Sequence, residues 1–363
     1  MKRLVQVVII ALILGALLIP LKVFAEGDET VDLQINSEFN ELLEDNGIDY
    51  SYDDIGELTI GAIAEKLRER LTDSGEKPLH LLGLILFVIM LSAVVRTAGG
   101  SIAESCDDIL STVGVLTAVT VISPVLLEAC GRALEAVRAG GNFVSVFIPV
   151  FTSVTAASGG VVSAGVYDLT VLAASELILQ LSSGYLMPIV SASTVLSVTG
   201  SIFSDHDFSG IVRLMKKVIT WGMTTVMTLF IGFVTLKCTL AGKTDGAATK
   251  TVRLVISGFV PIVGGAVSDA YAAVRSSFDI VRGTVGTGGC IAILLIILPP
   301  ILQILLIRAV MWTGTAAAEL FGETSIKKLL SSLDSGLAIA QSVLVCYGVM
   351  FVLCTGILMQ TTG

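Results

Sequence analysis

Charged side chains are scarce in this sequence. Asp, Glu, Lys and Arg make up 15% of its 363 residues, whereas ordinary soluble domains carry about 25%. Hydrophobic residues make up 54%, and the mean hydropathy is +0.89. Such a chain has too little polar surface to cover its apolar surface in water, so the composition predicts an integral membrane protein and excludes an ordinary soluble enzyme.

An excess of acidic over basic residues is found in only one segment. Residues 26–80 contain 16 Asp and Glu against 4 Lys and Arg, a net charge of −12, whereas the whole chain has a formal net charge of −9. The acidity therefore belongs to this segment and not to the apolar body. It also argues against nucleic acid as a partner of the exposed part.

Metal-binding and catalytic motifs are missing. The six cysteines form no CxxC pair, and the two histidines, His80 and His206, lie far apart, so we expect no Cys/His zinc site. No HExxH, GxGD, GxSxG or Walker A motif occurs, which removes the usual scaffolds of zinc proteases, aspartyl and serine hydrolases, and ATPases. We therefore expect no catalytic residues, no metal, no cofactor and no enzymatic activity.

The N-terminus has the pattern of a signal peptide. Lys2 and Arg3 precede an apolar run, and Val23 and Ala25 supply the small residues at positions −3 and −1 of a cleavage site. This pattern predicts a signal peptide over residues 1–25, with an uncleaved signal anchor as the alternative. Either way, residues 26–78 form a small acidic domain that is exported from the cytoplasm.

Within that exported domain, residues 57–71 are predicted to form an amphipathic helix. Ile60, Ile63, Leu67 and Leu71 recur at helical spacing, and charged residues fill the opposite face. The apolar face has three possible surroundings: the membrane surface, the membrane body of the same chain, or a partner protein.

Residues 79–363 are predicted to form a polytopic membrane domain, because apolar runs recur there at lengths near the 20 or so residues that a bilayer requires. The predicted spans are residues 81–97, 109–127, 167–183, 185–201, 216–237, 290–311 and 337–359. Between two of them, Glu128, Arg132, Glu135 and Arg138 alternate in sign at helical spacing, which indicates a salt-bridged, solvated face or an interface. The predicted fold is all-α, with about seven spans, two broken or re-entrant segments and a small exported helical domain.

The two broken segments are residues 142–157 and 252–268. Each is apolar but short, contains a proline, and is followed by or ends near a Gly-Gly pair. Paired Gly/Pro-interrupted segments line the substrate path in inverted-repeat transporters, and non-helical backbone persists at membrane depth only next to protein or a water-filled cavity. The predicted pore or gate residues are Phe147, Pro149, Gly159, Gly160, Phe259, Pro261, Gly264 and Gly265.

Polar residues inside the apolar runs are further candidates, because an ionisable group at mid-membrane costs about 2.5 to 3.5 kcal/mol. Glu176 lies within a predicted span with Gln180 one turn later, and Arg308 and Lys237 could each neutralise Glu176. These four residues either hold helices together or line a water-filled or ion-conducting path. The larger basic cluster, which includes Lys237, is predicted to be cytoplasmic, provided that residues 142–157 re-enter without crossing.

Several of these segments resemble one known family. The signal sequence, the acidic domain, residues 147–159 and above all the Phe-Val-Pro-Ile-Val-Gly-Gly-Ala-Val-Ser-Asp block at residues 259–269 are similar to the stage III sporulation protein AE family. The likeness covers nearly the whole chain in length and layout, and this block is its most specific part.

The resemblance implies a component of the channel-like complex that joins mother cell and forespore in endospore-forming bacteria. It implies a multi-pass location in the mother-cell membrane around the forespore, with the N-terminal domain in the intermembrane space. Implied partners are other stage III sporulation A proteins and, indirectly, stage II sporulation protein Q; a homo-oligomer is also possible. The alternative function is a stand-alone secondary permease for a small solute or ion, with Glu176 as the coupling carboxylate.

Overall fold

The computed structural model describes residues 78–95, 97, 104–181, 184, 187–202, 209–259 and 264–361. The predicted signal peptide, acidic exported domain and amphipathic helix 57–71 lie outside these residues and stay predictions.

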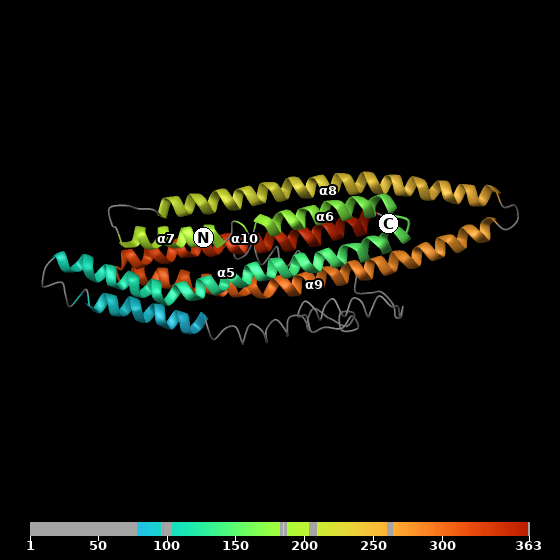
Figure 1. The fold of residues 1–363 in the computed structure, drawn as a ribbon. Helices are drawn as coiled ribbons and strands as arrows, with labels where there is room; N and C mark the ends of the chain where they lie inside the picture. The colour runs from blue at the N-terminus through green and yellow to red at the C-terminus, as the bar shows by residue number, and fades with distance from the viewer. Residues whose placement is uncertain are drawn as a thin grey trace.

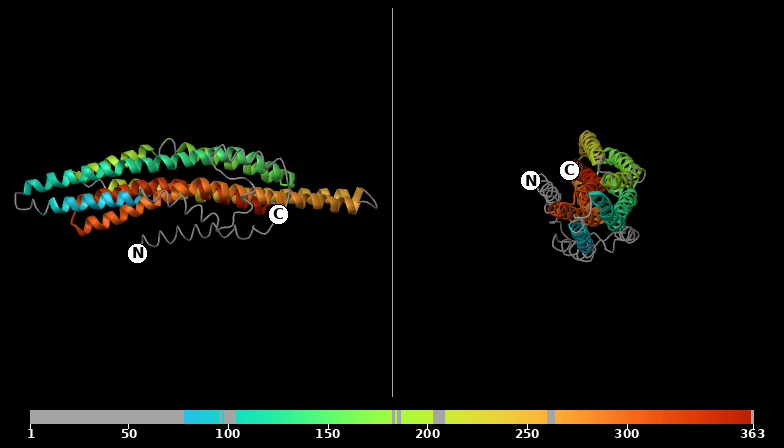
Figure 2. Two further views of the ribbon diagram at one scale, coloured as in Figure 1. Left: turned by 90° about the horizontal axis from the view of Figure 1, so that it is seen from below. Right: turned by 90° about the vertical axis from the view of Figure 1, so that its left-hand side faces the viewer.

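Every ordered element in the described part of the chain is a helix, which confirms the predicted all-α class. The described helices are Pro78–Val95, α5 (Glu104–Ala157), α6 (Val161–Leu181), α7 (Met187–Ile202), α8 (Ser209–Phe259), α9 (Gly264–Leu320) and α10 (Thr324–Thr361). They form one elongated bundle in which successive long helices run in opposite directions (Figure 1). Seen end-on, the helices surround a common axis (Figure 2).

Helix α10 occupies the centre of the bundle. It contacts all of α5 to α9, and every residue from 332 to 341 is buried. A helix that is buried around its whole circumference must be enclosed by other helices. Helices α5 to α9 therefore form a layer around α10.

Hydroxyl pairs fix the packing of α6 against α10. Tyr167 and Thr355 lie 2.8 Å apart, oxygen to oxygen, and Ser175 and Tyr347 lie 2.9 Å apart. Ser175 follows Tyr167 by eight residues on α6, and its partner Tyr347 precedes Thr355 by eight residues on α10. The two helices are therefore antiparallel. Such interhelical hydrogen bonds stabilise helix packing where the surroundings are apolar.

Six of the described helices are long and apolar enough to cross a membrane, with α7 too short to be counted among them. Helix α9 has 57 residues, and at 1.5 Å per residue it is about 86 Å long, whereas the hydrocarbon core of a bilayer is about 30 Å thick. The same comparison holds for α5 with 54 residues and α8 with 51. These helices must extend well beyond the hydrocarbon region, or lie steeply tilted within it.

The structure corrects the predicted boundaries of several spans. Residues 109–127 and 142–157 were predicted as separate segments, the second broken or re-entrant, but both belong to the single helix α5. The cytoplasmic location predicted for the larger basic cluster depended on that re-entry and loses this support. Residues 216–237 likewise continue into 252–259 within α8.

Helix α5 continues through Pro124 and Pro149 although each proline removes a backbone hydrogen bond. Membrane helices tolerate proline where nearby hydroxyls and neighbouring helices satisfy the backbone. Pro149 frees the carbonyl of Ser145, four residues earlier. The hydroxyls of Thr152 and Ser153 donate to other carbonyls, those of Ile148 at 2.9 Å and Pro149 at 2.7 Å. The helix is therefore supported here by the packing of Phe147 against α9 and α10. The charged stretch between the prolines also stays helical, with Arg132 paired to Glu128 at 2.7 Å and donating to Gln303 of α9 at 3.0 Å.

Candidate functional site

The turn between α5 and α6 is a tight reversal built on two glycines. Amide N–H groups of Ser158, Gly159 and Gly160 donate to the carbonyls of Val154, Ala156 and Thr155, each at 3.0 Å. Gly159 has φ of 93°, a conformation that side chains with a Cβ rarely adopt. The Gly-Gly pair therefore ends α5 and allows α6 to start at once.

Asp245 of α8 caps the beginning of α6. Its two carboxylate oxygens accept hydrogen bonds from the Val162 N–H at 3.0 Å and the Ser163 N–H at 2.9 Å, and Asp245 is only 4% exposed. The first N–H groups of a helix have no partner within that helix, and the positive end of the helix dipole favours a carboxylate. Asp245 thus does across two helices what an N-cap residue normally does within one.

Two arginines of α9 approach the same turn. The Arg275 guanidinium donates to the Thr249 hydroxyl of α8, and it lies 3.2 Å from where a Cβ would be on Gly159. The Arg282 guanidinium donates to the Ser158 hydroxyl and to the Met359 carbonyl of α10, both at 3.3 Å, and pairs with Asp279 at 3.2 Å.

We call this group the turn cluster; it comprises Ser158, Gly159, Ser163, Asp245, Thr249, Arg275, Asp279 and Arg282. It draws α5, α6, α8, α9 and α10 together at one level of the bundle. Its acidic and basic groups are engaged with each other, with hydroxyls or with backbone. The arrangement is suited to holding helices in a fixed relation.

An aromatic layer lies beside the turn cluster. Phe147 stacks on Phe143 and Phe151, with ring centroids 5.4 and 5.3 Å away, and meets Phe351 of α10 edge-on at 5.5 Å. A Cβ on Gly289 of α9 would overlap the Phe147 ring. This close approach of α5 and α9 depends on the missing side chain.

A second buried polar group joins α9 to α10. The Arg308 Nε donates to Asp334 at 2.8 Å, a terminal nitrogen donates to the Gln341 side-chain oxygen at 2.5 Å, and the guanidinium lies 5.2 Å from the Trp312 ring centre. Arg308 is 9% exposed, Asp334 7% and Gln341 3%. We call Arg308, Asp334 and Gln341 the arginine triad. A buried charge needs a partner of this kind, because its desolvation is otherwise uncompensated.

Comparison with known proteins identifies the family. A sequence profile described as stage III sporulation protein AE matches residues 46–362, which is most of the chain. The chain belongs to the stage III sporulation protein AE family. Stage III sporulation protein AE of Bacillus subtilis (strain 168) is 23% identical over 225 residues, covering 62% of this chain and 56% of that protein. The chain thus matches little more than half the length of that relative. No solved structure matches it.

Membership of the stage III sporulation protein AE family indicates a role in sporulation, as the resemblance suggested, and this is not a known enzyme family. Within the described residues, no group of three or more His, Cys, Asp or Glu side chains could hold a metal ion. Five of the chain's six cysteines, Cys130, Cys238, Cys290, Cys346 and Cys354, are free thiols.

The pore or gate residues predicted for this family member lie at, or within about three helical turns before, two helix reversals at the same end of the bundle (Figure 1). In the first, Phe147 is 1% exposed in the aromatic layer, Pro149 lies on the exposed side of α5, and Gly159 and Gly160 form the turn. In the second, Phe259 ends α8, Gly264 and Gly265 begin α9, and Pro261 lies outside the described residues. The two segments that were predicted to be broken thus belong to two helical hairpins. Their role in a pore stays a prediction.

Of the four intramembrane polar residues predicted from the sequence, the structure brings only Glu176 and Gln180 together. Glu176 is exposed and accepts a hydrogen bond from Gln180 at 3.0 Å, and Lys237 lies over the Phe233 ring at 5.4 Å. Among the described residues, neither Arg308 nor Lys237 forms an ion pair with Glu176, and the partner of Arg308 is Asp334. Sequence reasoning missed Asp334 and Asp245. The available signal for Asp334 was a lone carboxylate just ahead of the apolar run of α10, with Gln341 two turns later on the same face.

Proposed function

We propose that this protein is a non-enzymatic membrane component of the channel-like complex that joins mother cell and forespore during endospore formation. Family membership over residues 46–362 is the observation that carries the proposal. In this proposal the protein lies in the mother-cell membrane around the forespore. Its acidic N-terminal domain occupies the intermembrane space.

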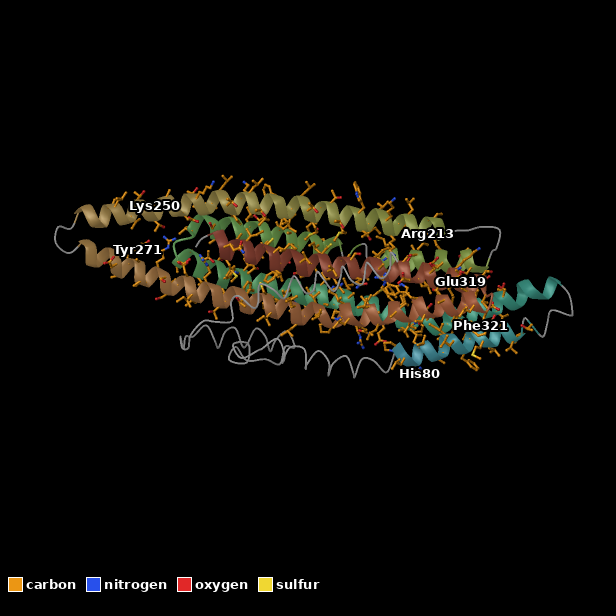
Figure 3. The ribbon with its side chains drawn as sticks, turned by 180° about the vertical axis from the view of Figure 1, so that it is seen from behind. His80, Arg213, Lys250, Tyr271, Glu319 and Phe321 are labelled. Carbon is orange, nitrogen blue, oxygen red and sulfur yellow. The ribbon has the colours of Figure 1, made fainter. Side chains whose placement is uncertain are left out.

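The shape of the bundle supports an assembly role. Helices α5, α8 and α9 exceed the thickness of a hydrocarbon core more than twofold, so the bundle has protein surface to offer on at least one side of the bilayer. The hairpin of α8 and α9 extends past the turn of α5 and α6, as Figure 1 shows. Lys250 and Tyr271 lie on this extension, at the opposite end from Glu319 and Phe321 (Figure 3).

The proposed partners are other stage III sporulation A proteins and, indirectly, stage II sporulation protein Q, with a homo-oligomer as a further possibility. A helical hairpin that projects from a bundle can meet such partners without disturbing the core. The interlocked turn cluster at its base would keep its direction fixed.

Cross-linking and co-purification of the protein from sporulating cells test this proposal. We expect the other stage III sporulation A proteins to be recovered with it, and to be lost when residues 250–274 of the hairpin are replaced by a short helical turn. Recovery of free monomer alone from cross-linked sporulating cells would contradict the assembly role.

A stand-alone permease receives less support from the geometry. A coupling carboxylate should reach the interior of a transport path, but Glu176 lies on the exposed side of α6 beside Gln180. Purified protein in liposomes separates the two functions. Solute flux without partners that is lost in Glu176→Gln would favour the permease, whereas inert liposomes favour the complex component.

A further inference from the structure

An apolar groove lies where the described part of the chain begins. It has a volume of about 410 Å³ and is formed by the first turns of the helix Pro78–Val95 and by α9. Its lining residues are Pro78, Leu79, Leu82, Leu306, Ala309, Val310 and Thr313. Figure 3 labels His80, which marks this end of the first described helix.

The groove is chemically uniform. Thr313 contributes its only side-chain hydroxyl, and this hydroxyl donates to the Ala309 carbonyl at 3.1 Å and the Val310 carbonyl at 2.9 Å. It is therefore already satisfied by its own helix. Leu79, at the edge of the groove, is 69% exposed. The site offers a ligand apolar contact and no hydrogen bonds, so its occupant must be apolar.

The chain itself supplies an apolar element next to this groove. The predicted amphipathic helix 57–71 places Ile60, Ile63, Leu67 and Leu71 on one face. The spacings of three and four residues between them make a continuous stripe. A stripe of this kind needs an apolar surface to cover it.

The connection is short enough to bring the stripe to the groove. Six residues, 72–77, separate Leu71 from Pro78, which itself lines the groove. An extended chain covers about 3.3 to 3.6 Å per residue, so this linker reaches about 20 Å. The lining of α9 from Leu306 to Thr313 rises only about 10 Å. A tether of this length gives the stripe a high effective concentration at the groove.

We infer that residues 57–71 dock in this groove, with Ile60, Ile63, Leu67 and Leu71 facing Leu79, Leu82, Leu306 and Val310. The contact holds the acidic N-terminal domain against the membrane body at the level of Pro78. It leaves the charged face of the segment, which includes Glu65 and Glu69, directed away from the bundle. This inference does not depend on the proposed transport role.

Disulfide cross-linking in the full-length chain, in membranes and without its native cysteines, tests the inference. The test pair is Leu67→Cys with Val310→Cys, and the matched control is Glu69→Cys with Val310→Cys. Positions 67 and 69 lie on opposite faces of a helix about 10 to 12 Å across. We expect a yield on the order of tenfold higher for the Leu67 pair, because only that face is held at the groove.

Equal yields from positions 67 and 69, or no cross-link from either, would overturn the docking. A second pair, Ile63→Cys with Leu306→Cys, tests the docking at another position, in case the geometry at position 67 is unfavourable for a disulfide. Adding Leu67→Asp to this second pair should reduce its cross-linking yield. The competing occupant is a lipid acyl chain. Strong quenching of a fluorophore at Val310→Cys by brominated lipid, unchanged by Leu67→Asp, would show that lipid fills the groove and would exclude the segment.

Discussion

Helices α8 and α10 are both apolar and both long enough to cross a bilayer, but their surroundings differ. In the apolar stretch of α10, 50% of the positions are buried within the protein, whereas in α8 the figure is 11%. The buried positions on α8 form one narrow stripe, which comprises Val212, Met227, Val234, Cys238, Ala241 and Asp245. Helix α10 is thus enclosed by protein, and α8 presents most of its surface to the outside.

The polar residues of the two helices follow from this difference. Helix α10 buries Asp334, Gln341 and Tyr347, each of which finds a partner on a neighbouring helix. The exposed threonines of α8, such as Thr228 and Thr235, donate instead to carbonyls of their own helix. Lipid offers no hydrogen-bond partners, so polar groups facing it must be satisfied locally. The interior can therefore carry specific polar contacts that the lipid-facing surface cannot.

Breaking the arginine triad should have the largest effect, because it removes a contact that only the enclosed helix can make. Arg308→Ala leaves Asp334 buried without its partner, and we expect the free energy of unfolding to fall by about 3 to 5 kcal/mol. Denaturant titration of the purified protein in detergent measures this change. The double variant Arg308→Met with Asp334→Leu should recover much of the loss, since no charge is then left unpaired. A double variant as unstable as Arg308→Ala would contradict this account.

Adding a side chain at a close approach between α5 and α10 should also destabilise the bundle. A Cβ on Gly140 of α5 would lie 2.6 Å from the Tyr347 ring of α10, whereas Gly232 of α8 has nothing within 4 Å. We expect Gly140→Leu to lower the free energy of unfolding by about 1 to 3 kcal/mol. Gly232→Leu is the matched control, and a thermal melt in detergent should show little change for it. Similar losses at both positions would remove the distinction between the two helices.

Removing the cap on α6 should loosen α8 from the bundle. Asp245→Ala leaves the N–H groups of Val162 and Ser163 without their acceptor, and loss of a cap typically costs about 1 to 2 kcal/mol. Cys238 is fully buried on the inner face of the same helix. With Cys238 as the sole cysteine, its alkylation by a membrane-permeant maleimide should be faster in Asp245→Ala, and less so in Asp245→Asn. An unchanged alkylation rate would show that Asp245 does not hold α8 in place.

The sequence predicted the helical class and the membrane location, and it singled out Arg308 as a charge within an apolar run, because hydropathy and isolated charges are local signals. It did not predict the continuity of α5. Local rules predict a break at a proline, whereas the packing of Phe147 against Gly289 of α9 and Phe351 of α10 supports the helix. Asp245 was missed for a related reason. Its partners, Val162 and Ser163, are more than 80 residues away, so no spacing in the sequence relates them.

The outer surface of α8 should tolerate truncation of its large side chains. Leu236 is 67% exposed, whereas Leu344 of α10 is fully buried. Leu236→Ala should change the free energy of unfolding by less than about 0.5 kcal/mol, because the side chain leaves lipid or detergent contacts and no protein cavity forms. Leu344→Ala, its matched control, should cost about 2 to 5 kcal/mol through the cavity left around the central helix. The comparison is best made by denaturant titration of the detergent-solubilised monomer. If Leu236→Ala is neutral in the monomer but weakens recovery of partners from cross-linked cells, this face of α8 contacts protein in the assembled complex rather than lipid.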